Sequence, residues 1–182
     1  MRNLAPDNST TLGNGMRYLI VLLLGLVCTS DLVLADDREA VFGRWAGDRS
    51  ILEVRPAEAG LEMVIVAMID PNYREGEEFG VPGEPRIDFR NPDDALREQP
   101  ILGLNLVSGY RFEGGTWQGK IYDPESGKVY SSRMKVSGEG NLEMRGYIGI
   151  PMFGRTATFV PVARCEAHII SMLDAVGIGG AC

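Results

Sequence analysis

The sequence predicts an all-β protein: an antiparallel, roughly eight-stranded up-and-down barrel with a short C-terminal helix, preceded by a signal peptide. Two observations predict the barrel. Short segments with alternating apolar residues follow one another from residue 42, and strong turn sequences separate them. A single helical spacing near the C-terminus and an apolar run near the N-terminus predict the other two elements.

The first 35 residues resemble a leader and not part of a fold. Met16-Arg17 begins a short basic region, residues 18–28 are apolar, and Val33-Leu34-Ala35 offers small residues for a signal peptidase. The apolar core is too short for a membrane span, which takes about 20 residues. We therefore expect a cleaved leader at 1–35, with Met16 as an alternative start. Lipidation at Cys28 is the disfavoured alternative, because Val27 precedes it.

Eight strands are predicted in the remaining chain, at residues 42–46, 50–55, 61–69, 101–112, 116–122, 128–136, 141–149 and 155–163. Turn sequences such as Glu113-Gly114-Gly115 and the run 123–127 supply the backbone angles that hairpins require. Apolar residues alternate within the strands, so each strand has one face to bury. Closing consecutive hairpins into a barrel buries these faces together and removes the sheet edges.

Two segments break the strand pattern. Residues 70–100 carry five prolines and many charges, which predicts a long loop with one helical turn at 92–97. This loop is either a lid over a barrel mouth or a solvated insertion. Residues 166–176 have helical apolar spacing, and Gly177 follows them. We expect a helix packed outside the barrel, so the barrel domain is 36–164 and the helix and tail are 165–182.

Charge and cysteine content restrict the function. The net charge of −7 is unchanged when residues 1–35 are removed, and an acidic chain repels phosphate backbones, so nucleic acid is not an expected partner. After leader cleavage we expect no transmembrane segment and a periplasmic or secreted protein. In such an oxidising compartment, Cys165 and Cys182 are predicted to form a disulfide; two free thiols are the alternative.

Catalytic and metal-binding patterns are scarce. His168 is the only histidine, which argues against a catalytic triad or a histidine-rich metal site, and no nucleotide-binding motif is present. Asp88 and Asp123 are the best carboxylate pair for a hydrolytic enzyme, but both stand in turn sequences, where aspartate bonds its own backbone. We therefore expect no cofactor, no metal and no catalytic residue. Arg145 and Tyr122 are predicted to point to solvent.

A set of motifs resembles a bacterial family called domain of unknown function 2147. The motifs are Gly43-x-Trp45, Asp88-x-x-Asn91-Pro92, Gly103-Leu104, Trp117-x-Gly119-x-Ile121-Tyr122-Asp123-Pro124-x-x-Gly127-Lys128-x-Tyr130, Leu142-x-x-Arg145-Gly146-Tyr147 and Phe153-Gly154-Arg155-Thr156. The resemblance implies export and a lipocalin-like barrel, and it brings no activity. We expect structural roles for Asp88, Asn91, Asp123 and Gly127. Phe159 stands where tryptophan is expected, and residues 165–182 lie beyond the pattern.

The Gly43-x-Trp45 triplet also resembles the lipocalin signature, which implies that Trp45 closes one end of the barrel under an arginine. Arg164, or failing that Arg155, is the candidate to stack on Trp45 as a cation–π pair.

Three functions fit these observations. The first is a barrel that binds a small apolar or amphipathic ligand, with a lining of Leu104, Leu106, Tyr110, Trp117, Tyr130, Met134 and Met144. The second is an envelope interaction or structural protein with a filled barrel, and the third is a carboxylate-based enzyme. A cavity of about 300 Å³ or more, open at one end, would favour the first function over the second.

Overall fold

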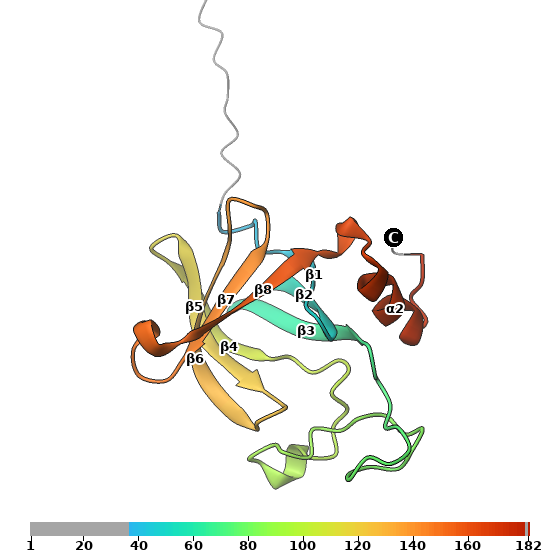
Figure 1. Cartoon of the computed structure of the whole chain (residues 1–182). Coiled ribbons are helices and arrows are strands. Elements are labelled where there is room, and N and C mark those ends of the chain that lie inside the picture. The colour runs from blue at the N-terminus through green and yellow to red at the C-terminus, as the bar shows by residue number, and fades with distance from the viewer. Residues whose placement is uncertain (1–36, 181) are drawn as a thin grey trace, which may run out of the picture. The chain divides into compact units, whose positions relative to one another are not determined.

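The computed structural model describes residues 37–180 and 182; the predicted signal peptide lies outside them. Eight antiparallel strands form one sheet in the order β3-β2-β1-β8-β7-β6-β5-β4 and curl into a barrel (Figure 1). The strands are β1 Gly43–Ala46, β2 Ser50–Ala57, β3 Gly60–Met68, β4 Val107–Glu113, β5 Thr116–Asp123, β6 Lys128–Val136, β7 Leu142–Tyr147 and β8 Arg155–Pro161. The predicted fold is therefore confirmed.

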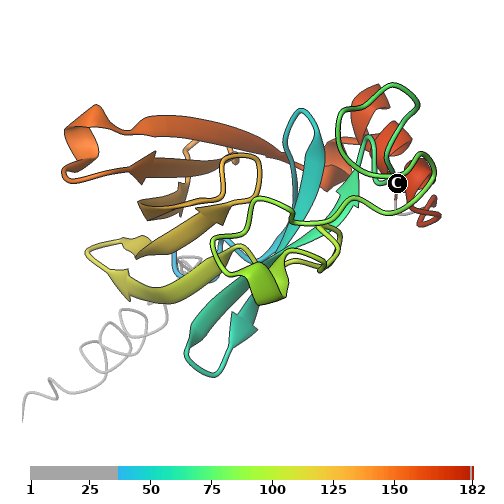
Figure 2. The ribbon, with the colours of Figure 1, turned by 90° about the horizontal axis from the view of Figure 1, so that it is seen from below.

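The strands follow one another around the barrel, and β1 pairs with β8 to join the first and last strands. Because neighbouring strands run in opposite directions, the β1–β2, β3–β4, β5–β6 and β7–β8 connections lie at one end, which we call the mouth end. The loop from residue 69 to residue 106 belongs to this end. It lies below the barrel in Figure 1 and in front of it in Figure 2.

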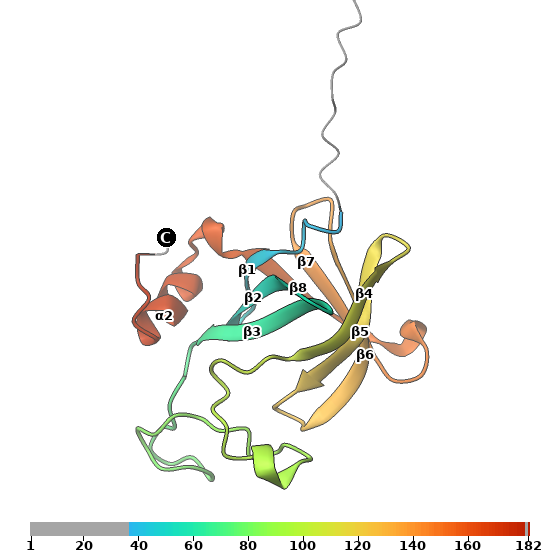
Figure 3. The same cartoon turned by 180° about the vertical axis from the view of Figure 1, so that it is seen from behind.

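The seam between β3 and β4 is closed by an irregular segment and not by a ladder (Figure 3). Ile65 N–H donates to the Leu104 carbonyl at 3.1 Å, and Leu106 N–H donates to the Met63 carbonyl at 2.8 Å. The side chain of Asn105 supplies a further acceptor, since its Oδ1 lies 3.0 Å from Met63 N. An asparagine side chain thus stands in for a missing backbone acceptor at the seam.

The predicted strand at 101–112 is wrong over its first half. Residues 101–106 hold a turn at Gly103, whose φ is +91°, and regular pairing begins only at Val107. Leu102 consequently faces solvent, with 37 % of its surface exposed. The other seven strands lie where the alternation predicts them, and the helical turn predicted at 92–97 is the 3-10 helix η1, Asp94–Leu96.

Tyr110 fills the middle of the barrel. Its ring is fully buried and lies directly over Gly119, where an added Cβ would come within 2.3 Å of the tyrosine Cδ2 atom. Among residues 37–180 and 182, no hydrogen-bond partner meets the hydroxyl of Tyr110 or that of buried Ser132. Burial raises the pKa of Tyr110 to about 12, against the lowering effect of the neighbouring Ser132 hydroxyl.

The helix α2, Ala167–Ala175, covers the outside of the barrel over β2 and β3 (Figures 1 and 3). Its buried residues Ile169, Met172 and Leu173 pack against Ile51 and Ala67, which point outward from paired positions on β2 and β3. The helix ends as predicted, with Gly177 at φ +72°. Within residues 37–180 and 182, no helix is long and apolar enough to cross a membrane.

The predicted Cys165–Cys182 disulfide is not formed in the structure, where both residues are free thiols. The Cys182 Sγ atom lies 3.7 Å from the Val162 carbonyl oxygen, and the Cys165 Sγ atom lies 3.9 Å from the Cys182 carbonyl oxygen. Each sulfur is therefore directed at a backbone carbonyl, an orientation that sequence separation does not determine.

Candidate functional site

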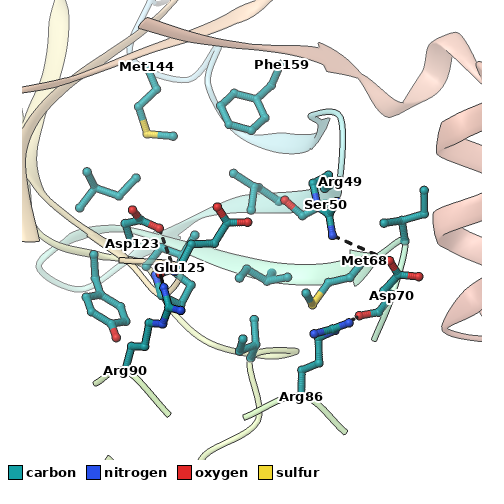
Figure 4. A pocket seen from close by; sticks show the side chains of 18 of the residues that line it. Arg49, Ser50, Met68, Asp70, Arg86, Arg90, Asp123, Glu125, Met144 and Phe159 are labelled. Atoms are coloured by element: carbon teal, nitrogen blue, oxygen red, sulfur yellow. Dashed lines mark hydrogen bonds and ion pairs between the residues drawn. The ribbon is translucent and has the colours of Figure 1, made fainter. Parts of the chain in front are cut away.

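A cavity of about 650 Å³ occupies the mouth end of the barrel (Figure 4). Its inner wall comes from inward-facing apolar residues on five strands and on the segment before β4: Leu52, Ile65, Leu106, Ile121, Met144 and Phe159. These positions alternate with outward residues, so strand geometry alone directs their side chains to one space. Eight strands leave room for one small ligand in the part of the barrel that large side chains do not fill.

Phe159 takes part in this wall where the family pattern leads us to expect tryptophan. It pairs with Leu142 across β7 and β8, and its ring packs against the backbone of Gly47, where an added Cβ would lie 2.9 Å from the ring.

The rim of the cavity is charged. Three arginines and three acidic residues border it: Arg49, Arg86, Arg90, Asp70, Asp123 and Glu125. Arg86 donates two hydrogen bonds to Glu77, at 2.7 and 2.6 Å, and these bonds are the main reason that the pKa of Glu77 lies below its usual value. The guanidinium of Arg86 is therefore occupied by contacts within the 70–100 loop.

Arg49 and Arg90 make fewer hydrogen bonds to the described residues around them than Arg86 does. Arg49 is 3.8 Å from an Asp70 oxygen, and Asp70 is also bound by Arg74. Arg90 stacks on Phe89 at 5.0 Å and donates to the Glu125 carbonyl oxygen at 2.5 Å. Figure 4 shows Arg49 and Arg90 on opposite sides of the opening. Either guanidinium has donors to offer to an acceptor at the mouth.

The loop 70–100 is fastened to the barrel through Asp88, which is only 1 % exposed. One Asp88 oxygen accepts the Tyr122 hydroxyl at 2.7 Å, and the other accepts the Asn91 amide at 2.7 Å. Burial and the bond to Asp88 together raise the pKa of Tyr122 above its usual value. The prediction that Tyr122 points to solvent is wrong. Its hydroxyl contacts the 70–100 loop through the hydrogen bond to Asp88.

A second attachment joins the loop to the β5–β6 turn. Asp123 accepts from Glu125 N–H at 3.0 Å and from the Ser126 hydroxyl at 2.6 Å, as an Asx turn does. Gly127 has a φ of +67°, and an added Cβ would lie 2.2 Å from the Arg90 carbonyl oxygen. Asp88, Asn91, Asp123 and Gly127, for which structural roles are predicted, make the contacts described for the loop and the turn. The loop borders the cavity, as a lid would.

Five of the seven predicted lining residues lie outside this cavity. Leu106 and Met144 line it; Tyr110, Trp117 and Met134 instead fill the other half of the barrel, because their large side chains meet at its narrow centre. Leu104 borders a second pocket, of about 560 Å³, between the loop and β5. Tyr130 is half-buried, with its hydroxyl 3.4 Å from that of Ser126.

The predicted stack of Arg164 on Trp45 is wrong. The indole N–H of Trp45 donates to the Val41 carbonyl at 2.8 Å, and Arg164 instead reaches the Asn141 side chain at 2.6 Å. An arginine does cover a tryptophan opposite the mouth end, where Arg38 lies 5.6 Å from the ring centre of Trp117. Arg38 also accepts the Trp117 indole N–H at its carbonyl, at 2.9 Å. Residues 38–41 therefore cover the end of the barrel opposite the mouth end.

Sequence reasoning did not place the rim arginines, because a loop has no periodicity that reveals which side chains turn inward. Ile65 and Ile121 could have been found, since both lie on the apolar faces that the alternation marks. Among residues 37–180 and 182, no group of three or more His, Cys, Asp and Glu side chains could hold a metal ion.

The fold and cavity together define a lipocalin-like barrel. The chain belongs to the family described as an uncharacterized protein conserved in bacteria (DUF2147), whose model matches residues 43–160. A solved structure with a similar fold is HP1028 from Helicobacter pylori, described as belonging to the lipocalin family. It aligns with a TM-score of 0.51 and 20 % identity, over 65 % of this chain and 78 % of that one. No curated protein matches the chain.

Proposed function

We propose that this protein is an exported, periplasmic carrier that binds a small amphipathic molecule in its barrel. The observation that carries the proposal is the cavity of about 650 Å³ at the mouth end. Its volume lies within the range of about 300–1,000 Å³ that is typical of small-molecule sites. A filled barrel, the alternative of an interaction or structural protein, would not leave this space.

The chemistry of the wall and the rim supports an amphipathic ligand. The interior is apolar and each buried CH₂ of a ligand contributes about 0.8 kcal/mol. The polar end of such a ligand would lie at the rim, where Arg90 and Arg49 offer guanidinium donors. We propose a carboxylate or another anionic acceptor as that polar end, and a non-catalytic role for Asp88 and Asp123, which serve the loop and the turn.

Binding can be tested with a dansyl-labelled fatty acid whose fluorescence increases in an apolar site. Met144→Trp places a larger side chain in the cavity and should weaken binding at least tenfold, while Val129→Trp on the exposed face of β6 should bind like the wild type. Ile121→Trp repeats the test at another wall position. Equal binding by all four proteins would refute the proposal.

Arg90→Gln tests the polar end of the ligand separately from its apolar part. It should weaken binding of the dansyl fatty acid and leave binding of its neutral methyl ester unchanged, because only the carboxylate uses the guanidinium. Native mass spectrometry of protein purified from its own periplasm would identify the class of any bound molecule. The same preparation tests export: the proposal expects the mature chain to begin at Asp36.

A further inference from the structure

The tip of the β7–β8 hairpin carries large apolar side chains in solvent. We call residues 148–153 the apolar tip; they include the 3-10 helix η2, Pro151–Phe153. The exposed fractions are 72 % for Ile148, 51 % for Ile150, 76 % for Met152 and 79 % for Phe153. Figures 1 and 3 show this hairpin projecting from the side of the barrel. Several neighbouring apolar side chains this exposed indicate a contact surface.

Arg145 holds the tip in a fixed shape. It was predicted to point to solvent, but its guanidinium donates to the Pro151 carbonyl at 2.7 Å, the Met152 carbonyl at 3.1 Å and the Thr156 hydroxyl at 2.9 Å. Gly154 packs against β7, where an added Cβ would lie 2.6 Å from the Gly146 carbonyl oxygen. The apolar side chains are therefore displayed outward without a need for reordering.

Three carbonyls of the tip accept hydrogen bonds from the hairpin itself. Phe153 N–H donates to the Ile150 carbonyl and Gly154 N–H donates to the Pro151 carbonyl, while Pro151 has no N–H to satisfy. Together with the bonds from Arg145, these contacts occupy three successive carbonyls, those of residues 150–152. Pairing these carbonyls reduces the cost of bringing this part of the tip into an apolar environment, where unpaired backbone groups are costly.

Exposed basic residues lie on the strands that flank the tip, although the whole chain has a net charge of −7. Arg155 begins β8 directly after the tip, and Arg133 lies on β6 opposite Arg145 of β7; both side chains are exposed. Lys128 at the start of β6 is also exposed, and it pairs in register with Asp123. An apolar projection next to exposed cations is complementary to an anionic membrane surface, where each basic residue contributes to attraction.

We propose that the apolar tip inserts into the interfacial layer of a phospholipid bilayer that contains anionic lipids, with the nearby basic residues on the headgroups. The tip is narrow and projecting, whereas a stable protein interface buries about 800 Å² on each partner. Because the β7–β8 connection belongs to the mouth end, this contact brings the end that holds the cavity to the membrane.

The test is co-sedimentation of the purified protein with vesicles of phosphatidylcholine alone and of phosphatidylcholine with phosphatidylglycerol. The wild type should bind the anionic vesicles at least tenfold better than the neutral ones, and added salt should weaken this binding. Met152→Ser with Phe153→Ser should lose at least tenfold in binding. The matched control is Val81→Ser with Ile170→Ser, which removes two exposed apolar side chains elsewhere and should bind like the wild type.

A second readout reports insertion directly. Phe153→Trp should show an indole emission shift to shorter wavelength with anionic vesicles, and quenching by brominated lipid. The proposal is overturned if the wild type binds neither kind of vesicle, or if the tip and control variants bind equally. It is also overturned if the wild type is a dimer that the tip variant converts to monomer without any vesicle binding, since a second copy would then cover the tip. The fatty-acid assay of the cavity should be unaffected by the tip variant, so each proposal can fail alone.

Discussion

The close contact between Gly119 and Tyr110 gives a prediction with a definite size. In Gly119→Ala the new Cβ would lie 2.3 Å from Tyr110 Cδ2 and 2.8 Å from Cγ and Cε2, far inside contact distance. Tyr110 is fully buried, so its ring has no solvent into which it can turn. The added methyl must displace either the ring or strand β5.

Overpacking of this kind costs about 1–3 kcal/mol. Urea unfolding followed by circular dichroism should therefore show a lower midpoint for Gly119→Ala, by about 1 M at a typical slope of about 2 kcal/mol per M. Gly138→Ala is the matched control. Nothing lies within 4 Å of its added Cβ, so it should be neutral or slightly stabilising.

A double-mutant cycle separates the Tyr110 contact from any general effect of alanine in β5. In a Tyr110→Ala background the steric cause is absent, and Gly119→Ala should then cost much less than in the wild type. The reasoning is refuted if Gly119→Ala is as stable as Gly138→Ala, or if its cost is the same in both backgrounds.

Three further predictions concern the seam, the buried tyrosine and the loop. Asn105→Ala should lower the free energy of unfolding by about 1–3 kcal/mol, because Met63 N–H loses its acceptor; an unchanged urea midpoint would contradict this. The contribution of Tyr110 to stability should be constant below pH 10 and fall between pH 10 and about 12, since the unfolded chain releases the Tyr110 proton first; Tyr110→Phe should reduce this fall in urea titrations. Asp88→Ala should speed proteolytic cleavage of the 70–100 loop, because the Tyr122 hydroxyl loses its acceptor, and wild-type resistance would count against the role assigned to Asp88.

The barrel structure gives a physical reason for several residues of the family motifs. Gly119 makes room for the Tyr110 ring, Gly127 makes room for the Arg90 carbonyl, and Asp123 closes the β5–β6 turn. Asp88 and Asn91 form the base of the loop. Such residues are recognisable in sequence as glycines and turn formers, but the partner that each one meets is distant along the chain.

The barrel could be predicted from local sequence: its strand positions, the turns between them, the helix at the C-terminus and the apolar faces. These features depend on short-range periodicity and on turn chemistry, which neighbouring residues decide. Four features came from the folded chain and could not be predicted: which half of the barrel is filled, where the cavity lies, the contacts of Arg145 with the β7–β8 hairpin and the position of Arg38 over Trp117. These features depend on side-chain volumes and on contacts between residues that are far apart in the sequence. Local sequence patterns therefore do not predict them.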